Sequence, residues 1–187
     1  MAGRLLELFG RRESAIGLYQ ETLQCKPQFK AAENRMAYLL AALGRLEQAQ
    51  THFQAVLQSD PANAVAHFNL GYVFDKRGRF EQAIESFQEA VRLNPKIDRA
   101  WYGLGMAHAA LHNHEEAAKA LHAAATLQPM NPHAWYQLGM AHHTLRNAEK
   151  VTEVVMHLLR FDPRVTRRLI LDTGRSDLAH LVKDLVA

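Results

Sequence analysis

The chain has 187 residues, 48% of them hydrophobic, and carries a formal net charge of +3 at pH 7. This composition excludes a disordered chain and is typical of a sequence that folds. Basic and acidic residues are interspersed, and no basic stripe alternates with aromatic residues, so the sequence predicts no nucleic-acid partner.

Three features predict a cytoplasmic protein without a membrane partner. The longest wholly apolar run, residues 37–43, is much shorter than a membrane span. Residues 1–20 mix charged and apolar side chains and lack the uninterrupted apolar segment of a secretory signal. Cys25 is the only cysteine, so no internal disulfide can form, which fits a reducing compartment.

The prolines divide the chain into repeats. Five of the six follow one another at a constant spacing of 34 residues: Pro27, Pro61, Pro95, Pro129 and Pro163. A fixed period of this length predicts one supersecondary unit that is stacked repeatedly. We expect an array over residues 1–165, made of a partial unit followed by four full units: 1–29, 30–63, 64–97, 98–131 and 132–165.

The partial first unit lacks about the first turn and a half of its first helix. The residues that fit the repeat pattern are Gly3, Leu6, Gly10, Ala15 and Tyr19. No preceding helix pair covers its apolar face, and the open end of a stack is adhesive. The sequence therefore predicts a homodimer, or docking of a partner or of the chain's own tail, through Leu5, Leu6, Leu8 and Phe9.

Each full unit predicts two antiparallel helices. In the first helix, the run Trp101-x-x-Leu104-Gly105 recurs as Trp135-x-x-Leu138-Gly139. We expect both tryptophans in the core between helices. In the second helix, small and larger apolar residues recur four apart: Ala49 and Phe53, Ala83 and Phe87, Ala117 and Leu121, Val151 and Val155. The small residues in both helices predict that the two helices approach closely.

The pattern of each unit also predicts a turn between its two helices and the end of the second helix. The proline ends the second helix, because it lacks an amide donor and disfavours helical geometry in the residue before it. The turn between the helices calls for a left-handed residue, which glycine adopts most easily. The residues at this place are Gly10, Gly44, Gly78, His112 and Arg146.

Residues 166–187 depart from the repeat and predict C-terminal capping helices. We expect one helix to about Leu171, a break at Gly174 and a second helix capped by Ser176 or Asp177. The second helix has one apolar stripe, formed by Leu178, Leu181, Val182 and Leu185. Such a segment would cover the last full unit as a lid.

The repeat pattern resembles that of the tetratricopeptide repeat family, which reads Trp-x-x-Leu-Gly-x-x-Tyr, then Ala-x-x-x-Phe, then Pro. The first full unit departs most from it, with Glu33, Met36, Ala37 and Leu40 at the places of Trp, Leu, Gly and Tyr. The resemblance implies an all-α, right-handed superhelical solenoid of antiparallel helix pairs. It also implies a protein–protein interaction scaffold, in which the first helices line a concave groove.

The resemblance further implies which side chains would bind a partner peptide or helix. Aromatic rings and methionines on such a surface suit adaptable binding of an apolar segment. The alternative is that these groups pack on one another or on the chain's own tail. The groove residues would be Asn34, Tyr38, Phe68, Tyr72, Asp75, Arg99, Tyr102, Met106, His133, Tyr136, Met140 and His143.

A carboxylate clamp is not expected in this groove. Chaperone-binding members of the family hold a terminal carboxylate with Lys, Asn, Asn, Lys and Arg at five places. The residues at these places here are Asn34, Tyr38, Asn69, Arg99 and Gly103. Only Asn69 matches, with Arg99 as a substitute for lysine.

The sequence predicts neither an enzyme nor a cofactor. No nucleophile, base and acid recur in positions that could converge, and no glycine-rich phosphate loop is present. Cys25 is expected to be a small packing residue. His108 and His112 have the spacing of a metal-binding pair, but one falls on a helix seam and the other in a turn, so no metal site is expected. The alternatives are a His-rich metal-binding repeat protein and an accessory repeat lobe that serves an enzyme in another chain.

Overall fold

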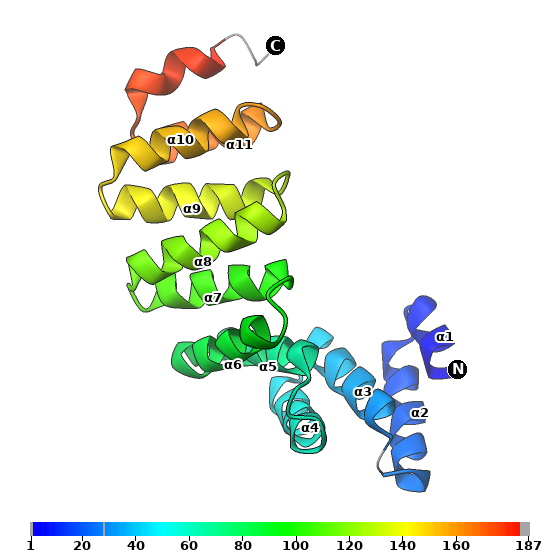
Figure 1. Ribbon diagram of the computed structural model, residues 1–187. Coiled ribbons are helices and arrows are strands. Elements are labelled where there is room, and N and C mark those ends of the chain that lie inside the picture. Colours follow the sequence, from blue (N-terminus) through cyan, green and yellow to red (C-terminus); the bar gives the residue numbers. More distant parts are fainter. Residues whose placement is uncertain (1, 28, 184–187) are drawn as a thin grey trace. The chain divides into compact units, whose positions relative to one another are not determined.

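A computed structural model describes residues 2–27 and 29–183, which form eleven α-helices and one 3-10 helix and no strand (Figure 1). Consecutive helices pack as antiparallel pairs, so the predicted all-α architecture is confirmed. The chain divides into two compact units, one up to Pro95 and the other from Lys96 onward. Each unit has its own packed helices and is described separately.

The first unit contains six helices, and each packs against the next along the chain. The third and fifth helices also contact each other. The bounds of the helices are α1 Ala2–Leu8, α2 Arg12–Cys25, α3 Lys30–Ala42, α4 Leu46–Ser59, α5 Ala64–Lys76 and α6 Phe80–Leu93.

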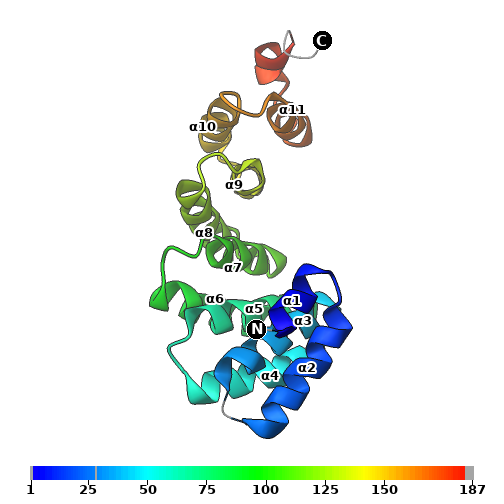
Figure 2. The same ribbon diagram turned by 90° about the vertical axis from the view of Figure 1, so that its right-hand side faces the viewer.

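The second unit contains α7 Asp98–Ala110, α8 His114–Leu127, α9 Pro132–Thr144, α10 Ala148–Leu158, α11 Pro163–Asp172 and the 3-10 helix η1 Ser176–Val182. Within this unit, α7, α9 and α11 lie on one side, and α8 and α10 lie on the other (Figure 2). The surface formed by the three odd-numbered helices is called the α7–α9–α11 face below.

The turn within each helix pair has the predicted left-handed residue. Gly44 and Gly78 have φ of +77° and +70°, and His112 and Arg146 adopt the same conformation at +60° and +56°. The residue after each of them donates its backbone N–H to the carbonyl five residues earlier, as Asn113 does to His108 at 2.9 Å. This bond satisfies a carbonyl at the helix end, and glycine makes it without steric cost.

Glycine should therefore stabilise the two turns that lack it. A side chain in the left-handed region costs about 1–2 kcal/mol, part of which is offset by the greater freedom of glycine in the unfolded chain. We expect His112→Gly and Arg146→Gly each to raise the free energy of unfolding by roughly 0.5–1 kcal/mol in urea denaturation. His122→Gly, in the middle of α8, is the control and should lower it by about 1 kcal/mol. Equal losses in all three variants would contradict this explanation.

Glycines on the first helices let large side chains approach, as predicted. A Cβ atom on Gly71 would lie 2.7 Å from the ring of Phe87, and one on Gly105 would lie 2.6 Å from Leu121. Both partners are buried residues of the second helix in the same pair. Gly139 differs, because the side chain that faces it at 2.7 Å is Leu169 of α11 and not a residue of α10.

The sequence period fails before α11. The helices α5, α7 and α9 begin at residues 64, 98 and 132, and the same period would place the next start at residue 166. Instead α11 begins three residues early, at Pro163, with Asp162 accepting a bond from the N–H of Val165 at 2.9 Å. Pro163 therefore starts a helix, although the repeat pattern predicted that it only stops one.

The segment after α11 also differs from the prediction in detail. Gly174 breaks the chain with φ of +66°, but η1 is a 3-10 helix and not a second α-helix. Neither Ser176 nor Asp177 is its cap, because Arg175 precedes the helix and binds Asp177 through its guanidinium at 2.7 and 2.9 Å. Leu178 and Val182 are buried as expected, Leu181 is half-buried, and Leu185 lies outside the described residues.

Candidate peptide-binding surface

In the first unit, α3 and α5 carry the predicted groove residues on helices that contact each other. Tyr38 and Tyr72 are 50% and 40% exposed. Lys76 lies over the ring of Tyr72, 5.4 Å from its centroid, and its ammonium group is 3.6 Å from Asp75. These residues leave two tyrosine rings accessible to a partner.

Two other predicted residues of this unit are less accessible. Asn34 and Phe68 are half-buried. The ring of Phe68 packs 6.1 Å from that of the buried Phe87, so Phe68 belongs in part to the core. Phe68 therefore packs in part within the protein, which was the alternative to peptide binding.

In the second unit, the predicted residues on α7 and α9 are arginine, histidine and apolar side chains. Arg99, His133 and His143 are exposed. The four apolar members are half-buried and pack against the core of the unit: Tyr102, Met106, Tyr136 and Met140. They present one edge to solvent while the rest of each side chain is held in place.

A hollow of about 380 Å³ brings three of these residues together. It is lined by Asp98, Arg99 and Tyr102 of α7, by His133 of α9 and by Asn131. Burial raises the pKa of the Tyr102 phenol, and its bond with the Gln137 side chain acts in the opposite direction. The ring is thus fixed beside a cationic group, in a concave site that could receive a side chain of a partner.

Sequence reasoning missed the contribution of α11 to this surface. The guanidinium of Arg168 lies over the ring of Tyr136, 5.0 Å from its centroid. The Tyr136 hydroxyl donates to Asp172 at 2.6 Å, and this bond is the main cause that raises the tyrosine pKa. The Gln137 side chain of α9 forms a hydrogen bond with Tyr102 of α7, at the corresponding pair of places. The fifth place of one helix thus meets the sixth place of the next at both interfaces, and a three-residue shift of the repeat register would have placed α11 in this pattern.

Comparison with known proteins agrees with this architecture. A family model described as tetratricopeptide repeat matches residues 34–97, 74–121 and 102–150, which together span more than half of the chain. The chain belongs to the tetratricopeptide repeat family. A search of curated proteins gave no match.

Several solved tetratricopeptide structures share the fold. MamA has a TM-score of 0.78 at 19% identity, over 95% of this chain and 96% of that one. YrrB, described as a TPR protein with an unusual peptide-binding site, has a TM-score of 0.77 at 22% identity, over 92% and 88%. PilF of Pseudomonas aeruginosa has a TM-score of 0.77 at 19% identity, over 96% and 84%. At these identities, the likeness concerns the fold alone.

The second compact unit, which begins at Lys96, also has a larger pocket of about 790 Å³. This pocket lies between α8, α9 and α10, on the side opposite the α7–α9–α11 face. The Trp135 ring on its wall stacks on His157 at 3.9 Å. The indole N–H donates to the Pro129 carbonyl at 2.9 Å, and His157 Nε2 lies 3.1 Å from the same oxygen. Trp101 and Trp135 both pack against the core, as predicted.

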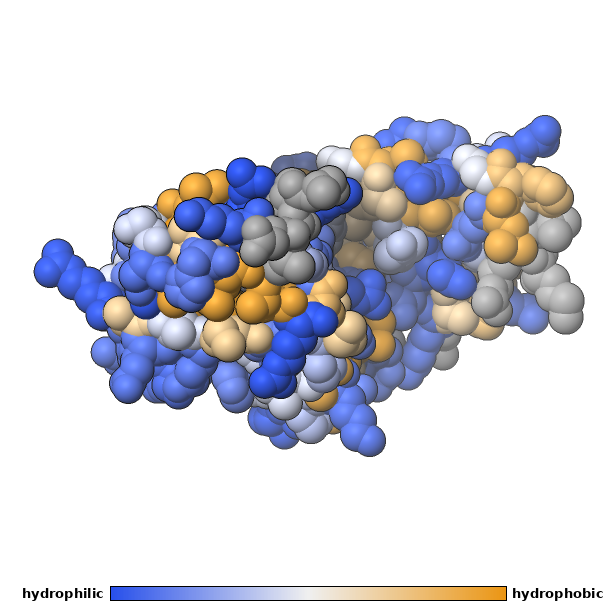
Figure 3. Space-filling view, turned by 90° about the horizontal axis from the view of Figure 1, so that it is seen from above, coloured by the Kyte–Doolittle hydropathy of each residue, from blue (hydrophilic) through white to orange (hydrophobic). Residues whose placement is uncertain are grey.

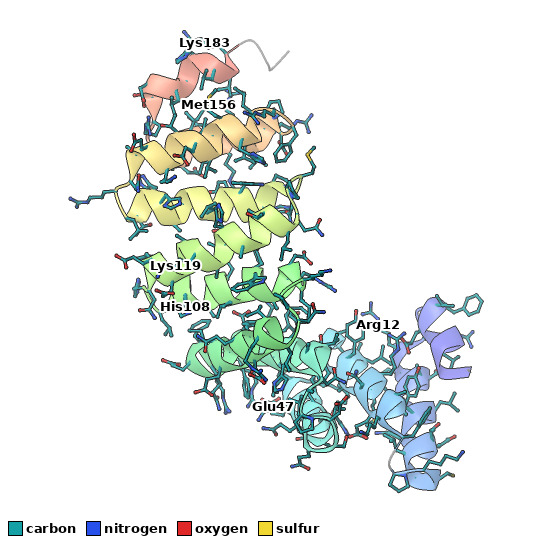
Figure 4. All side chains as sticks on the ribbon, viewed as in Figure 1. Arg12, Glu47, His108, Lys119, Met156 and Lys183 are labelled. Atoms are coloured by element: carbon teal, nitrogen blue, oxygen red, sulfur yellow. The ribbon has the colours of Figure 1, made fainter. Side chains whose placement is uncertain are left out.

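The histidines of this tetratricopeptide protein do not gather around a metal site. Among residues 2–27 and 29–183, no three His, Cys, Asp or Glu side chains are placed to hold an ion. His112 is in a turn, with its ring 5.8 Å from that of His114. His108, labelled in Figure 4, lies on α7 with a buried Nδ1 that has no hydrogen-bond partner, and His142 of α9 is placed alike.

Cys25 is the last residue of α2 and is exposed, so the prediction that it is a packing residue is wrong. The helix end places its side chain in solvent, although the repeat pattern has an apolar residue there. No helix in the described part of the chain is both long and apolar enough to cross a membrane.

Acidification should destabilise this protein through two partly buried histidines on first helices, His108 and His142. Burial lowers the pKa of both His108 and His142, and Lys150 and His122 lower that of His142 further, against Glu153. Since Glu116 only partly opposes the shift at His108, the unfolded chain binds more protons below about pH 6.5. Stability should thus fall as the pH drops below that value.

The double variant His108→Tyr/His142→Tyr tests this expectation, because tyrosine does not titrate between neutral and mildly acid pH. Urea unfolding of the wild type and the variant at several pH values between neutral and mildly acid would measure the difference. The variant should lose less stability on acidification. Parallel pH profiles for the two proteins would show that other groups cause the effect.

Proposed function

We propose that this tetratricopeptide protein is a non-catalytic scaffold that binds a peptide or helix of a partner protein. The hollow that joins Arg99, Tyr102 and His133 is the observation that carries the proposal, because it combines a half-buried aromatic ring with an exposed guanidinium and an exposed imidazole. The exposed Tyr38 and Tyr72 offer similar anchors in the first unit. The family's fold is generally non-catalytic, and a related fold in YrrB is described as having a peptide-binding site.

Selection of binders followed by cross-linking tests the proposal. A display library of random peptides would be selected on the immobilised full chain. The photo-reactive variant Met106→benzoylphenylalanine, on the α7–α9–α11 face, should capture the selected peptide. The same replacement of Lys119, on α8 (Figure 4), is the matched control and should not. Failure to enrich any peptide, or capture only from position 119, would overturn the proposal.

Exposed apolar residues at the end of α1 support self-association as a second property. Leu8 and Phe9 are 83% and 73% exposed, and Leu6 is half-buried. The Leu5 side chain, which the sequence placed on the same face, lies outside the described residues. A symmetric dimer through this end would bury these groups.

Charged replacements test the dimer directly. We expect Leu8→Asp/Phe9→Asp to convert a dimer into a monomer in light scattering, while Leu171→Asp, an exposed leucine of α11, leaves the mass unchanged. A wild-type chain that stays monomeric at high concentration would contradict self-association through α1.

A further inference from the structure

The three helices of the α7–α9–α11 face begin at residues 98, 132 and 163, which sets their side chains in a common register. Counted from these starts, the second residues are all arginine or histidine: Arg99, His133 and Arg164. All three are exposed. The ninth residues are all apolar: Met106, Met140 and Leu171. The face thus has a basic row along one edge and an apolar row farther along the helices.

Contacts between the helices support this register. The sixth residue of α9, Gln137, bonds to the fifth residue of α7, Tyr102. The sixth residue of α11, Arg168, stacks on the fifth residue of α9, Tyr136. Because the same pair of places meets at both interfaces, α11 continues the surface of α7 and α9 and does more than cover the last pair.

The carboxylates near the basic row are mostly engaged elsewhere. Asp162 accepts a bond from the N–H of Val165, and Asp172 binds Tyr136 and Arg168. Asp98 is the exception, since it lines the same hollow as Arg99. By contrast, Arg164 and Arg167 are exposed, and no hydrogen bond or ion pair within the described residues engages them.

On α11, an exposed apolar side chain and two basic side chains share one turn of the helix. Leu171 is exposed, and it follows Arg167 and Arg168 by four and three residues. Figure 3 looks onto the C-terminal end of the second unit, where hydrophobic surface adjoins hydrophilic surface. A partner that satisfies both rows needs carboxylates and apolar side chains on one short segment. A phosphate backbone would satisfy the arginines but leave the methionines and Leu171 in water.

We propose that the α7–α9–α11 face binds an acidic, apolar peptide segment of a partner protein. Its carboxylates would pair with Arg99 and Arg164, and its apolar side chains would cover Met106, Met140 and Leu171. Arginine suits this role because its planar fork binds a carboxylate through two hydrogen bonds. This inference rests on the proposed scaffold function and adds the chemistry of the partner and the participation of α11.

Peptide selection on charge variants tests the inference. The same random-peptide library would be selected on the full wild-type chain, and the best peptide would be titrated against Arg99→Glu, Arg164→Glu and Lys119→Glu. We expect the selected peptides to be rich in Asp, Glu and large apolar residues. Each arginine variant should weaken binding at least about tenfold, while Lys119→Glu, on α8, should have no effect. Reversing the peptide's acidic residues to lysine should restore part of the affinity for the arginine variants.

The outcomes separate this inference from the function on which it rests. Peptides without an excess of acidic residues that still depend on Tyr102 would overturn the inference and leave the scaffold function intact. Loss of binding with Arg99→Glu but not with Arg164→Glu would remove α11 from the surface. A face that ignores peptides and instead binds RNA or anionic vesicles would overturn both. Circular dichroism melting of each variant verifies that it is folded.

Discussion

Replacing Phe87 with alanine should lower the free energy of unfolding by about 3–5 kcal/mol, because it removes a large ring from a packed interior. Phe87 is 2% exposed, and its ring fills the space beside Gly71 against Phe68. Urea denaturation followed by circular dichroism measures the change. Tyr38→Ala removes a ring from the surface of the same unit and should change stability by no more than about 0.5 kcal/mol.

The pair α5–α6 also allows a test of the cause. Gly71→Leu alone should destabilise the protein, since its Cβ would meet the Phe87 ring at 2.7 Å. In the Phe87→Ala background, the same leucine fills the cavity and should recover part of the loss. Losses that simply add in the double variant would mean that the two residues do not share one space.

Replacing Tyr102 with alanine should weaken binding of a selected peptide by roughly 30-fold, corresponding to about 2 kcal/mol for one aromatic anchor. Fluorescence anisotropy with the labelled peptide measures the affinity. Tyr102→Phe keeps the ring in the hollow and should retain most of the binding. His122→Ala, on α8, provides the control away from this face.

The same variant decides between binding and internal packing. Tyr102 is half-buried against the core of its unit, so some loss of stability is expected from its removal. If Tyr102→Ala melts far below the wild type while the affinity of its folded fraction is unchanged, the ring serves packing and not recognition. The notable contrast is with Phe68, whose contact with Phe87 already assigns it in part to the core.

Most of the fold could be predicted because its causes are local. A helix end at Gly78, or a close approach at Gly105, depends on one residue and its immediate neighbours, so it recurs wherever the pattern recurs. The conformation of His112 and Arg146 followed from their place alone, although neither residue favours it. Because the unit repeats, several separate stretches of sequence led to the same structural prediction.

The parts that could not be predicted depend on changes of register and on exposure. The fixed period would put Asp172 and Thr173 at the places of Leu and Gly, and this mismatch made the segment after Pro163 a departure from the repeat. The proline spacing carries no sign that α11 begins three residues early. The sequence also could not distinguish Phe68, which is partly core, from the accessible Tyr72. Both occupy first-helix places, and only the packing of neighbouring helices separates them.

The contact between Gly139 and Leu169 affects how such a chain could grow by copying its repeats. Within the segment 98–131, Gly105 and its partner Leu121 are inherited together, so a tandem duplication would carry a complete interface. The segment 132–165 contains Gly139 but not Leu169, so a copy of it would carry a glycine without its partner. A 34-residue segment of the gene therefore does not always encode a complete packing unit of the protein. Duplication of the segment that ends before α9 would therefore destabilise the fold less than duplication of the segment that begins with α9.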